Sequence, residues 1–177
     1  MPRTRSAQPS PTGPVRLGPE ARAALRPAAA EVSDGFWYTR REVNARTSIP
    51  QGPGLLESAG NLHNLRLAAP VPEALSDAAA EGGFEGSYPF VDTDVYKWLE
   101  AAAWQLAQGP SAELEADVER IISLVAAAQQ PDGYLNTWFQ LVKDGERYQD
   151  LRWGHELYCA GHLIQAGVAH HRATGRT

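Results

Sequence analysis

The sequence contains one cysteine, Cys159, among its 177 residues. A single thiol cannot close a disulfide within the chain, so a disulfide-stabilised scaffold is excluded. A metal site that needs several cysteines of this chain is excluded for the same reason. The fold must therefore be held by burial of apolar side chains and by hydrogen bonds.

The sequence also lacks an excess of positive charge and a long apolar run. Its formal net charge is −5, which argues against nucleic acid or an anionic membrane as the main partner. The longest nearly uncharged stretch, residues 123–142, is interrupted by the polar and turn-forming residues 129–133, so no membrane span is predicted. A hydrophobic content of 43% with 21% charged residues is instead typical of a folded globular domain.

Residues 1–30 differ from the rest of the chain in charge and in proline content. They carry five arginines against one glutamate, together with six prolines. They lack the apolar stretch of a secretory signal, and Pro11, Pro14 and Pro19 would break an amphipathic transit helix. We expect residues 1–30 to form a mostly disordered leader, residues 31–177 to form the folded domain, and the protein to be cytoplasmic.

Helical periodicity becomes clear after residue 92 and predicts three long helices. The first covers about 93–108, with Asp92 or Thr93 as its cap. The second is capped by Ser111, and the third covers about 154–173. The apolar residues of the second helix that share one face are Leu114, Val118, Ile121, Ile122 and Val125. Long helices joined by short connections predict an all-α fold with antiparallel hairpins.

The third helix carries the sequence GHELYCAGH at residues 154–162 and ends at Gly175. At about 100° per residue, its aliphatic residues and its histidines fall on opposite stripes. The aliphatic stripe, predicted to pack against the core, consists of Leu157, Gly161, Ile164 and Val168. The histidine stripe, predicted to face solvent or a cavity, consists of His155, Cys159, His162 and Ala166.

Several interpretations of the histidine stripe compete. A zinc protease needs two histidines at i and i+4, and Cys159 stands where the second one belongs, so that motif fails. A mixed metal site of His155, Cys159 and His162 is compatible with one helix face but requires a fourth ligand. Two hydrogen-bonded histidines inside a helical protein, or a polar stripe that faces a ligand, agree better with the spacing.

Three other features have both a structural and a functional interpretation. Asp92 and Asp94 resemble paired acid/base carboxylates, but a position at a helix start is more typical of capping. Residues 129–137 are rich in polar groups and are compatible with a polyol site or with an ordinary Asp-Gly turn. Of the five tryptophans, Trp138 and Trp153 flank loops and are candidates for stacking on a sugar.

Three long segments follow one another in a distinctive order: DTDVYKWLEAA at 92–102, AQQPDGYLNT at 128–137 and HELYCAGH at 155–162. Shorter pieces precede them: GFW at 35–37, IP at 49–50 and GNLHNLRLA at 60–68. Together these motifs resemble the front part of the family 127 glycoside hydrolases, the β-L-arabinofuranosidases. The resemblance covers about residues 15–177.

The resemblance implies an (α/α)6 barrel of six helical hairpins, of which this chain is the incomplete N-terminal part. It also implies retaining cleavage by a cysteine thiolate, held on zinc with other cysteines and a glutamate, and a second glutamate as acid/base. Zinc suits such a nucleophile because it keeps a thiol deprotonated at neutral pH. In the family these groups lie beyond the matched stretch. We therefore expect no catalytic residue, no metal ligand and no cofactor within this chain.

The part that remains resembles a sugar-binding wall, with His155 as the leading contact and His162 as a second. Glu156 lies beside the stripe and is a candidate to orient His155. We expect the N-terminal fragment of an enzyme that cleaves terminal β-L-arabinofuranosides with retention, and we expect the fragment alone to be inactive. The alternative is a non-catalytic helical module that binds carbohydrate or protein. The sequence predicts no oligomeric state.

Overall fold

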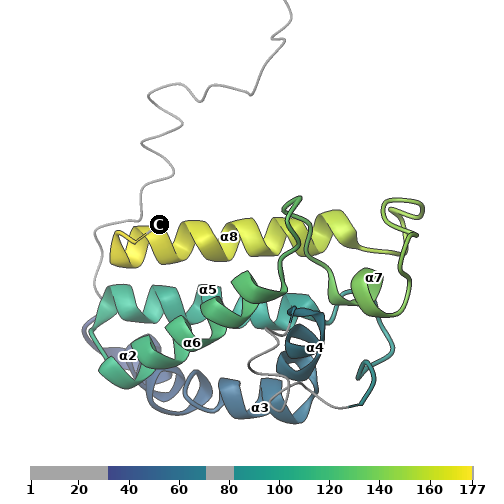
Figure 1. Cartoon of the computed structure of the whole chain (residues 1–177). Coiled ribbons are helices and arrows are strands. Elements are labelled where there is room, and N and C mark those ends of the chain that lie inside the picture. Colours follow the sequence, from purple (N-terminus) through teal and green to yellow (C-terminus); the bar gives the residue numbers. More distant parts are fainter. Residues whose placement is uncertain (1–31, 71–81, 177) are drawn as a thin grey trace, which may run out of the picture. The chain divides into compact units, whose positions relative to one another are not determined.

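The computed structural model describes residues 32–70 and 82–176, so the predicted leader at residues 1–30 lies outside the described residues. Within these two ranges every regular element is helical (Figure 1). The chain divides after Tyr38 into two units, and the second, from Thr39 onward, contains all of the helices from α3 to α8. The prediction of an all-α fold is confirmed for the described part of the chain.

The elements follow one another in a simple order. They are α2 (Gly35–Val43), the π-helix η1 (Asn44–Ser48), α3 (Gly52–Ser58), α4 (Asn61–Ala68), α5 (Asp92–Gln108), α6 (Ala112–Ala128), α7 (Thr137–Leu141) and α8 (Glu156–Thr174). The three long helices predicted from periodicity are α5, α6 and α8. None of the described helices combines the length and apolar character needed to cross a bilayer.

Helix α6 begins and packs as its sequence predicts. The Ser111 side chain accepts a hydrogen bond from the Leu114 backbone N–H at 3.3 Å, and two glutamates occupy the first turn. Both features satisfy the positive end of a helix. Its predicted apolar face is confirmed, because Leu114, Val118, Ile121 and Val125 are buried and Ile122 is half-buried.

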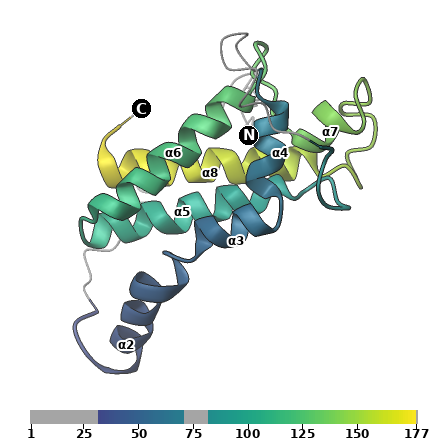
Figure 2. The same ribbon diagram turned by 60° about the horizontal axis from the view of Figure 1, so that its bottom comes forward.

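Helices α5 and α8 lie side by side and run in the same direction (Figures 1 and 2). Lys97 Nζ lies 2.7 Å from Tyr158 Oη near their beginnings. Further along both helices, the Gln165 side chain donates to Glu100 at 3.0 Å. Helix α6 runs in the opposite direction, since Glu115 near its start binds Arg176 just beyond the end of α8. This alternation agrees with part of an (α/α)6 barrel.

The predicted orientation of α8 is wrong. Its aliphatic stripe is exposed, with Leu157 63%, Ile164 67% and Val168 45% accessible. The opposite stripe is the packed one, because Cys159 and Ala166 are buried. The reason is size: helices approach closely where the side chains between them are small. The sequence pattern marked the larger aliphatic residues as the core, whereas the contact with α5 selected the small ones.

The segment before α5 is fixed by two asparagines of α4. The Asn64 side chain exchanges two hydrogen bonds with the Glu85 backbone, each of 2.8 Å, and the Asn61 amide donates to the Val91 carbonyl at 2.7 Å. Gly60 precedes α4 with φ 81°, a left-handed conformation that glycine adopts at low cost. These contacts fix Glu85 and Val91 against α4, and Phe90 of the same segment packs against His155 at the start of α8.

Candidate functional site

His155 occupies the position just before α8 and has an unusual backbone, with φ 55° and ψ 20°. Its ring Nδ1 lies 2.6 Å from the Trp153 carbonyl oxygen. A carbonyl oxygen only accepts hydrogen bonds, so Nδ1 carries the proton. The other ring nitrogen, Nε2, is then an acceptor in the neutral ring and a donor in the imidazolium.

The two histidines of the stripe are joined through an intervening tyrosine. The Tyr158 ring centroid lies 6.0 Å from that of His155 and 4.6 Å from that of His162, with both pairs nearly perpendicular. Phe90 packs on the other side of His155, with centroids 4.9 Å apart. The Lys97 ammonium lies 5.1 Å from the Tyr158 ring centroid. We call Phe90, Lys97, His155, Tyr158 and His162 the histidine cluster.

His162 is half-buried, and its Nδ1 is a buried nitrogen without a hydrogen-bond partner in the part of the chain that is described. Leaving a buried polar atom unpaired costs about 1–3 kcal/mol. The ring therefore has capacity for one further hydrogen bond. The structure brings His155 and His162 together on one face, as the helical spacing predicts.

The backbone of residues 89–91, which carries Phe90 against His155, accepts three hydrogen bonds from other segments. The Pro89 carbonyl accepts from the Asn136 amide at 3.1 Å and from the Cys159 thiol at 3.7 Å. The carbonyl of Val91, two residues on, accepts from Asn61 of α4. Because Phe90 lies between these two anchored carbonyls, its ring is held against His155.

Cys159 is a structural thiol in this arrangement. It is fully buried, and burial, followed by the nearby Asp92 carboxylate, raises the pKa of the thiol to about 12. A thiol with that pKa is neither a thiolate nucleophile nor a ready metal ligand at neutral pH. Residues 32–70 and 82–176 contain no group of three His, Cys, Asp or Glu side chains placed to hold a metal ion. The described residues therefore do not fit the zinc centre that the resemblance implies.

Asp92 does not cap its own helix, contrary to the prediction from its position. Its carboxylate accepts from the Thr137 backbone N–H at 2.7 Å and from the Thr137 hydroxyl at 2.5 Å. It thereby ties the start of α5 to the start of α7. Burial raises the pKa of Asp92, and the two bonds from Thr137 oppose that rise. Asp94 is exposed, so the two carboxylates do not form an acid/base pair.

The polar residues of the 129–137 segment are used inside the protein. Asn136 caps α7 by accepting from the Phe139 N–H at 3.2 Å, and Thr137 is bound to Asp92. The interpretation of this segment as an open polyol site is therefore wrong for these two residues. Of the candidate stacking residues, Trp138 is half-buried against Phe84, whereas Trp153 is 65% exposed.

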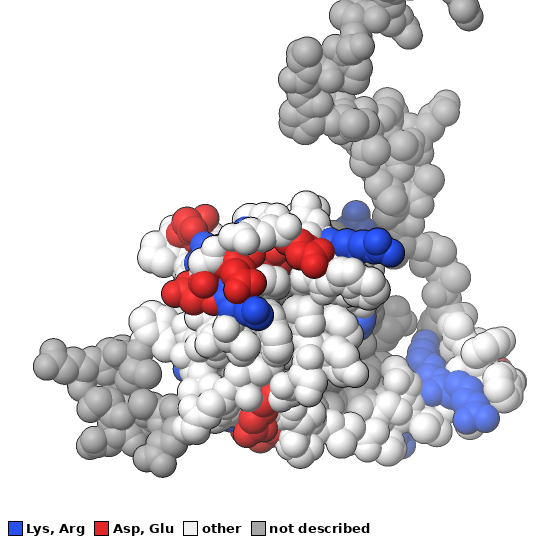
Figure 3. Space-filling view, turned by 90° about the vertical axis from the view of Figure 1, so that its right-hand side faces the viewer, with Lys and Arg blue, Asp and Glu red and all other residues white. Residues whose placement is uncertain are grey.

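The loop after α7 is rich in charges of both signs. Lys143 and Glu146 lie 3.3 Å apart, and Arg147 lies 3.0 Å from Asp132. Figure 3 shows this side of the protein, where acidic and basic groups lie next to one another in its upper part. Mixed exposed pairs of this kind stabilise little, at most about 1 kcal/mol each. They give the loop no strong field of either sign.

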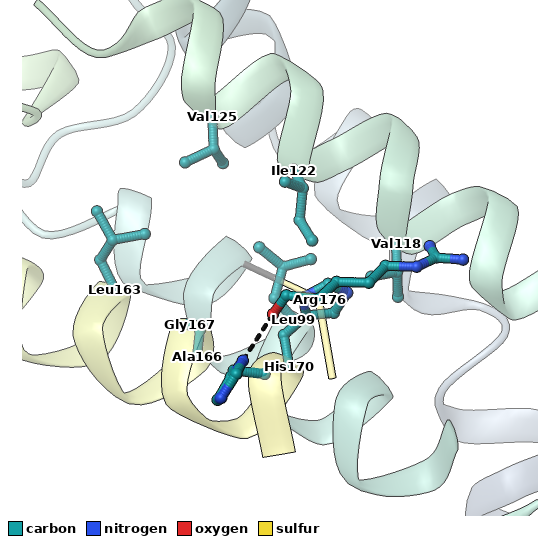
Figure 4. A pocket seen from close by; sticks show the side chains of 10 residues that line it. Leu99, Val118, Ile122, Val125, Leu163, Ala166, Gly167, His170 and Arg176 are labelled. Carbon is teal, nitrogen blue, oxygen red and sulfur yellow. Dashed lines mark hydrogen bonds between the residues drawn. The ribbon is translucent and has the colours of Figure 1, made fainter. Parts of the chain in front are cut away.

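Two of the cavities in the described part of the chain lie along α8, and the residues that line these two do not include His155 or His162. The larger, about 370 Å³, is an apolar groove toward the far end of α8, whose lining includes Leu99, Val118 and Leu163 (Figure 4). The smaller, about 220 Å³, lies beside the start of α8, where Tyr134, Tyr148 and Glu156 contribute polar atoms.

Comparisons with known proteins agree with this arrangement of motifs and helices. The family model described as "Beta-L-arabinofuranosidase, GH127 catalytic domain" matches residues 29–177. The chain belongs to the GH127 β-L-arabinofuranosidase family. The resemblance drawn from the sequence motifs is confirmed.

Individual GH127 proteins show how much of such a domain this chain represents. It is 36% identical over 163 residues to the non-reducing end β-L-arabinofuranosidase of Bifidobacterium longum subsp. longum, covering 81% of this chain and 24% of that protein. A GH127 β-L-arabinofuranosidase from Geobacillus stearothermophilus T6 superimposes with a TM-score of 0.75 at 40% identity. A second GH127 β-arabinofuranosidase gives a TM-score of 0.69 at 30% identity. Each solved structure is covered over 23% of its length, against 82% of this chain.

The sequence motifs suggested His155 and His162 as candidate site residues but did not suggest three of their neighbours. Tyr158 could have been found, since it lies three residues after His155 and four before His162 on the same helix. Lys97 and Phe90 come from other segments, and only the packing of α5 and of residues 82–91 against α8 brings them close.

Proposed function

We propose that this chain forms one wall of the sugar site of a retaining glycoside hydrolase that cleaves terminal β-L-arabinofuranosides. The observation that carries the proposal is the placement of His155 within a GH127 domain. Its Nδ1 is committed to the Trp153 carbonyl, so Nε2 is presented to a ligand. An imidazole nitrogen fixed in this way suits a hydrogen bond to one sugar hydroxyl.

The neighbours of His155 supply what a furanose ring needs beyond that one hydrogen bond. His162, seven residues further along the same helix face, adds a second, half-buried imidazole. Trp153 is largely exposed and directly precedes Gly154 and His155, which makes it the better of the two tryptophans for stacking on the apolar face of a sugar. We therefore assign His155 and His162 to substrate binding, with Trp153 as an aromatic contact.

The catalytic chemistry is proposed to come from residues outside these 177. A nucleophile held on zinc by several cysteines cannot be built from one buried cysteine whose pKa is raised to about 12. The chain also spans about a quarter of the length of the relatives it matches. We expect it to bind the sugar weakly and to hydrolyse nothing by itself.

Binding and turnover are tested separately on the purified chain. Methyl β-L-arabinofuranoside is titrated while the ring resonances of the histidines are followed by NMR, and we expect those of His155 and His162 to shift. His155→Gly removes the imidazole yet accepts the left-handed backbone, so it should weaken binding about tenfold, the loss of one well-placed hydrogen bond. His171→Ala, at an exposed position near the other end of α8, is the matched control.

Turnover is measured with a chromogenic aryl β-L-arabinofuranoside in the presence of zinc. We expect no product from the chain alone. Release of the aryl group would contradict the assignment of catalysis to other residues. A ligand that shifts His171 as strongly as His155 would contradict the assignment of the sugar to the histidine cluster.

A second candidate function is a non-catalytic helical module that binds a protein partner. The observation that favours it is the exposed stripe of Leu157, Ile164 and Val168 on α8. Aligned aliphatic side chains on a surface often mark a contact with another polypeptide. Replacing Ile164 with Glu should then abolish partner binding and leave sugar binding intact, whereas His155→Gly should do the opposite.

A further inference from the structure

We infer that Glu156 is a positioning residue for His155 and that it acts through the backbone of residues 148–155 without touching the imidazole. The inference rests on the proposed role of His155 in binding the sugar. It differs from the simplest expectation from the sequence, in which a glutamate next to a histidine orients it by a direct hydrogen bond.

The Glu156 carboxylate is buried and fully engaged elsewhere. Glu156 is only 3% exposed, although it carries a carboxyl group and stands at the first position of α8. One oxygen accepts a hydrogen bond from the Tyr134 hydroxyl, and the other accepts from the Tyr148 backbone N–H at 2.7 Å. Burial of a carboxylate is costly unless such partners compensate it, so this pair of bonds defines what Glu156 does.

The segment that Glu156 holds has an unusual backbone at both ends. Tyr148 with φ 59° and His155 with φ 55° are the non-glycine residues with positive φ in the described ranges. A left-handed residue other than glycine costs roughly 1–2 kcal/mol and persists only where its surroundings impose it. Glu156 binds the N–H of the first of these residues and directly follows the second. It therefore restrains both ends of the segment.

The middle of the segment is closed on itself. The Gly154 N–H donates to the Asp150 carbonyl at 2.8 Å, and the Trp153 N–H donates to the Asp150 side chain at 3.1 Å. The Trp153 carbonyl is thus free to accept from His155 Nδ1 at 2.6 Å. The orientation of the imidazole follows from the shape of this loop, and the loop is fastened to the protein by Glu156.

Tyr134 provides the fixed point on the other side of the carboxylate. Its ring packs edge-on against Tyr148 with centroids 5.5 Å apart, and the Arg147 guanidinium lies 3.9 Å above it. Burial, and then the hydrogen bond to Glu156, raise the pKa of Tyr134, so its hydroxyl remains a donor at all ordinary pH values. The Glu156 carboxylate therefore links the 130–134 turn, the 148–155 loop and the start of α8.

The test measures the state of the His155 ring, which a change of stability alone does not alter. Long-range proton–nitrogen NMR distinguishes the tautomer with hydrogen on Nδ1 from the one with hydrogen on Nε2. In the native chain we expect the Nδ1–H tautomer of His155. Glu156→Ala removes both acceptor oxygens, so we expect a mixture of tautomers and about tenfold weaker binding of methyl β-L-arabinofuranoside.

Two milder variants keep the test decisive if Glu156→Ala does not fold. Glu156→Gln keeps the shape and one acceptor oxygen, and it should restore most of the Nδ1–H tautomer. Tyr134→Phe removes a single hydrogen bond and should give an intermediate result. Glu146→Gln is the control, because Glu146 is an exposed residue of the preceding loop that pairs with Lys143.

The outcomes separate this inference from the proposed function. If Glu156→Ala or, should it not fold, Tyr134→Phe leaves the His155 tautomer and the sugar affinity as in the native chain, the positioning role is wrong. If the tautomer changes as expected but the sugar shifts no histidine resonance in any variant, the positioning role holds and the proposed function fails. A control variant with the same effect as Glu156→Ala would also overturn the inference.

Discussion

The two ends of α8 are built in different ways. At its start, Asp92, Asn136, Glu156 and Cys159 are buried and each makes a hydrogen bond to a neighbouring segment. Toward its other end the helix borders an apolar groove of about 370 Å³. Hydrogen bonds have strict geometry, whereas apolar contacts are non-directional. The hydrogen bonds at the start of α8 can therefore hold a side chain such as His155 in one orientation. Apolar contacts at the other end do not fix an orientation in this way.

The largest effect is expected from removing Asp92 at the polar end. Asp92→Ala leaves the N–H and the hydroxyl of Thr137 buried without their acceptor, so we expect a loss of about 3–4 kcal/mol in the free energy of unfolding. Urea denaturation of the chain measures it. Asp94→Ala, two residues on but exposed, should change the free energy by no more than about 0.5 kcal/mol. Equal effects of the two variants would remove the distinction between the ends of α8.

Two glycines test the packing at each end of the helix. A Cβ at Gly154 would lie 2.7 Å from the Asp150 carbonyl oxygen and 2.9 Å from the Phe139 ring. Gly154→Ala should therefore cost about 2 kcal/mol through overpacking. A Cβ at Gly167, which lines the groove, would meet nothing within 4 Å. Gly167→Ala should stabilise by about 0.5–1 kcal/mol, because alanine favours a helix interior. Thermal melting of both variants shows directly whether each substitution lowers or raises the stability of the protein.

The pH dependence of stability tests whether burial or hydrogen bonding dominates the pKa of Asp92. Its pKa is raised by burial in the folded protein, so the folded state binds the proton more tightly than the unfolded state does. The stability contributed in this way is fully present below the unfolded pKa, about 3.9, and is lost as pH rises through the folded pKa. The unfolding free energy of the native chain minus that of Asp92→Asn should thus fall with rising pH above about 4. A difference that rises with pH would show that the Thr137 bonds outweigh burial.

The smallest effect is expected at Tyr96, the neighbour of Asp92 on α5. Its hydroxyl is buried and has no hydrogen-bond partner in the described structure, while its ring packs in the core. Tyr96→Phe removes the unpaired hydroxyl and keeps the ring, so stability should be unchanged or rise by up to about 1 kcal/mol. Denaturation midpoints measure this change. A clear loss of stability would mean that the hydroxyl has a partner in solution.

Predictions from the sequence were most accurate for features that depend on local interactions, such as helix ends. The end of α5, the start of α6 and the end of α8 follow from the Gly-Pro pair at 109–110, from Ser111 and from Gly175, each of which acts on its own few residues. The apolar face of α6 follows from spacing alone. The fold beyond these helices was predicted from the resemblance of whole motifs to the GH127 family. The comparisons with GH127 proteins confirmed that resemblance.

Prediction from the sequence failed where the role of a residue depends on a segment that is distant in the chain. Asp92 is suited to capping a helix, but Thr137, 45 residues later, takes its carboxylate. The faces of α8 were interchanged because the small residues Cys159 and Ala166 fit closer to α5 than Leu157 and Ile164 would. The spacing of residues within one helix does not predict how closely a neighbouring helix packs against it.

The sequence by itself determined the helices, the family and the spacing of the two histidines, about two turns apart on one helix face, because these depend on residue order and on the regular geometry of one helix. Only the tertiary structure decided which face of α8 is buried, and which atoms hold His155 in a left-handed backbone with one ring nitrogen engaged. The physical reason is that hydrogen bonds such as those of Glu156 and Asp92 join segments far apart in the chain, and their geometry exists only after the segments have packed.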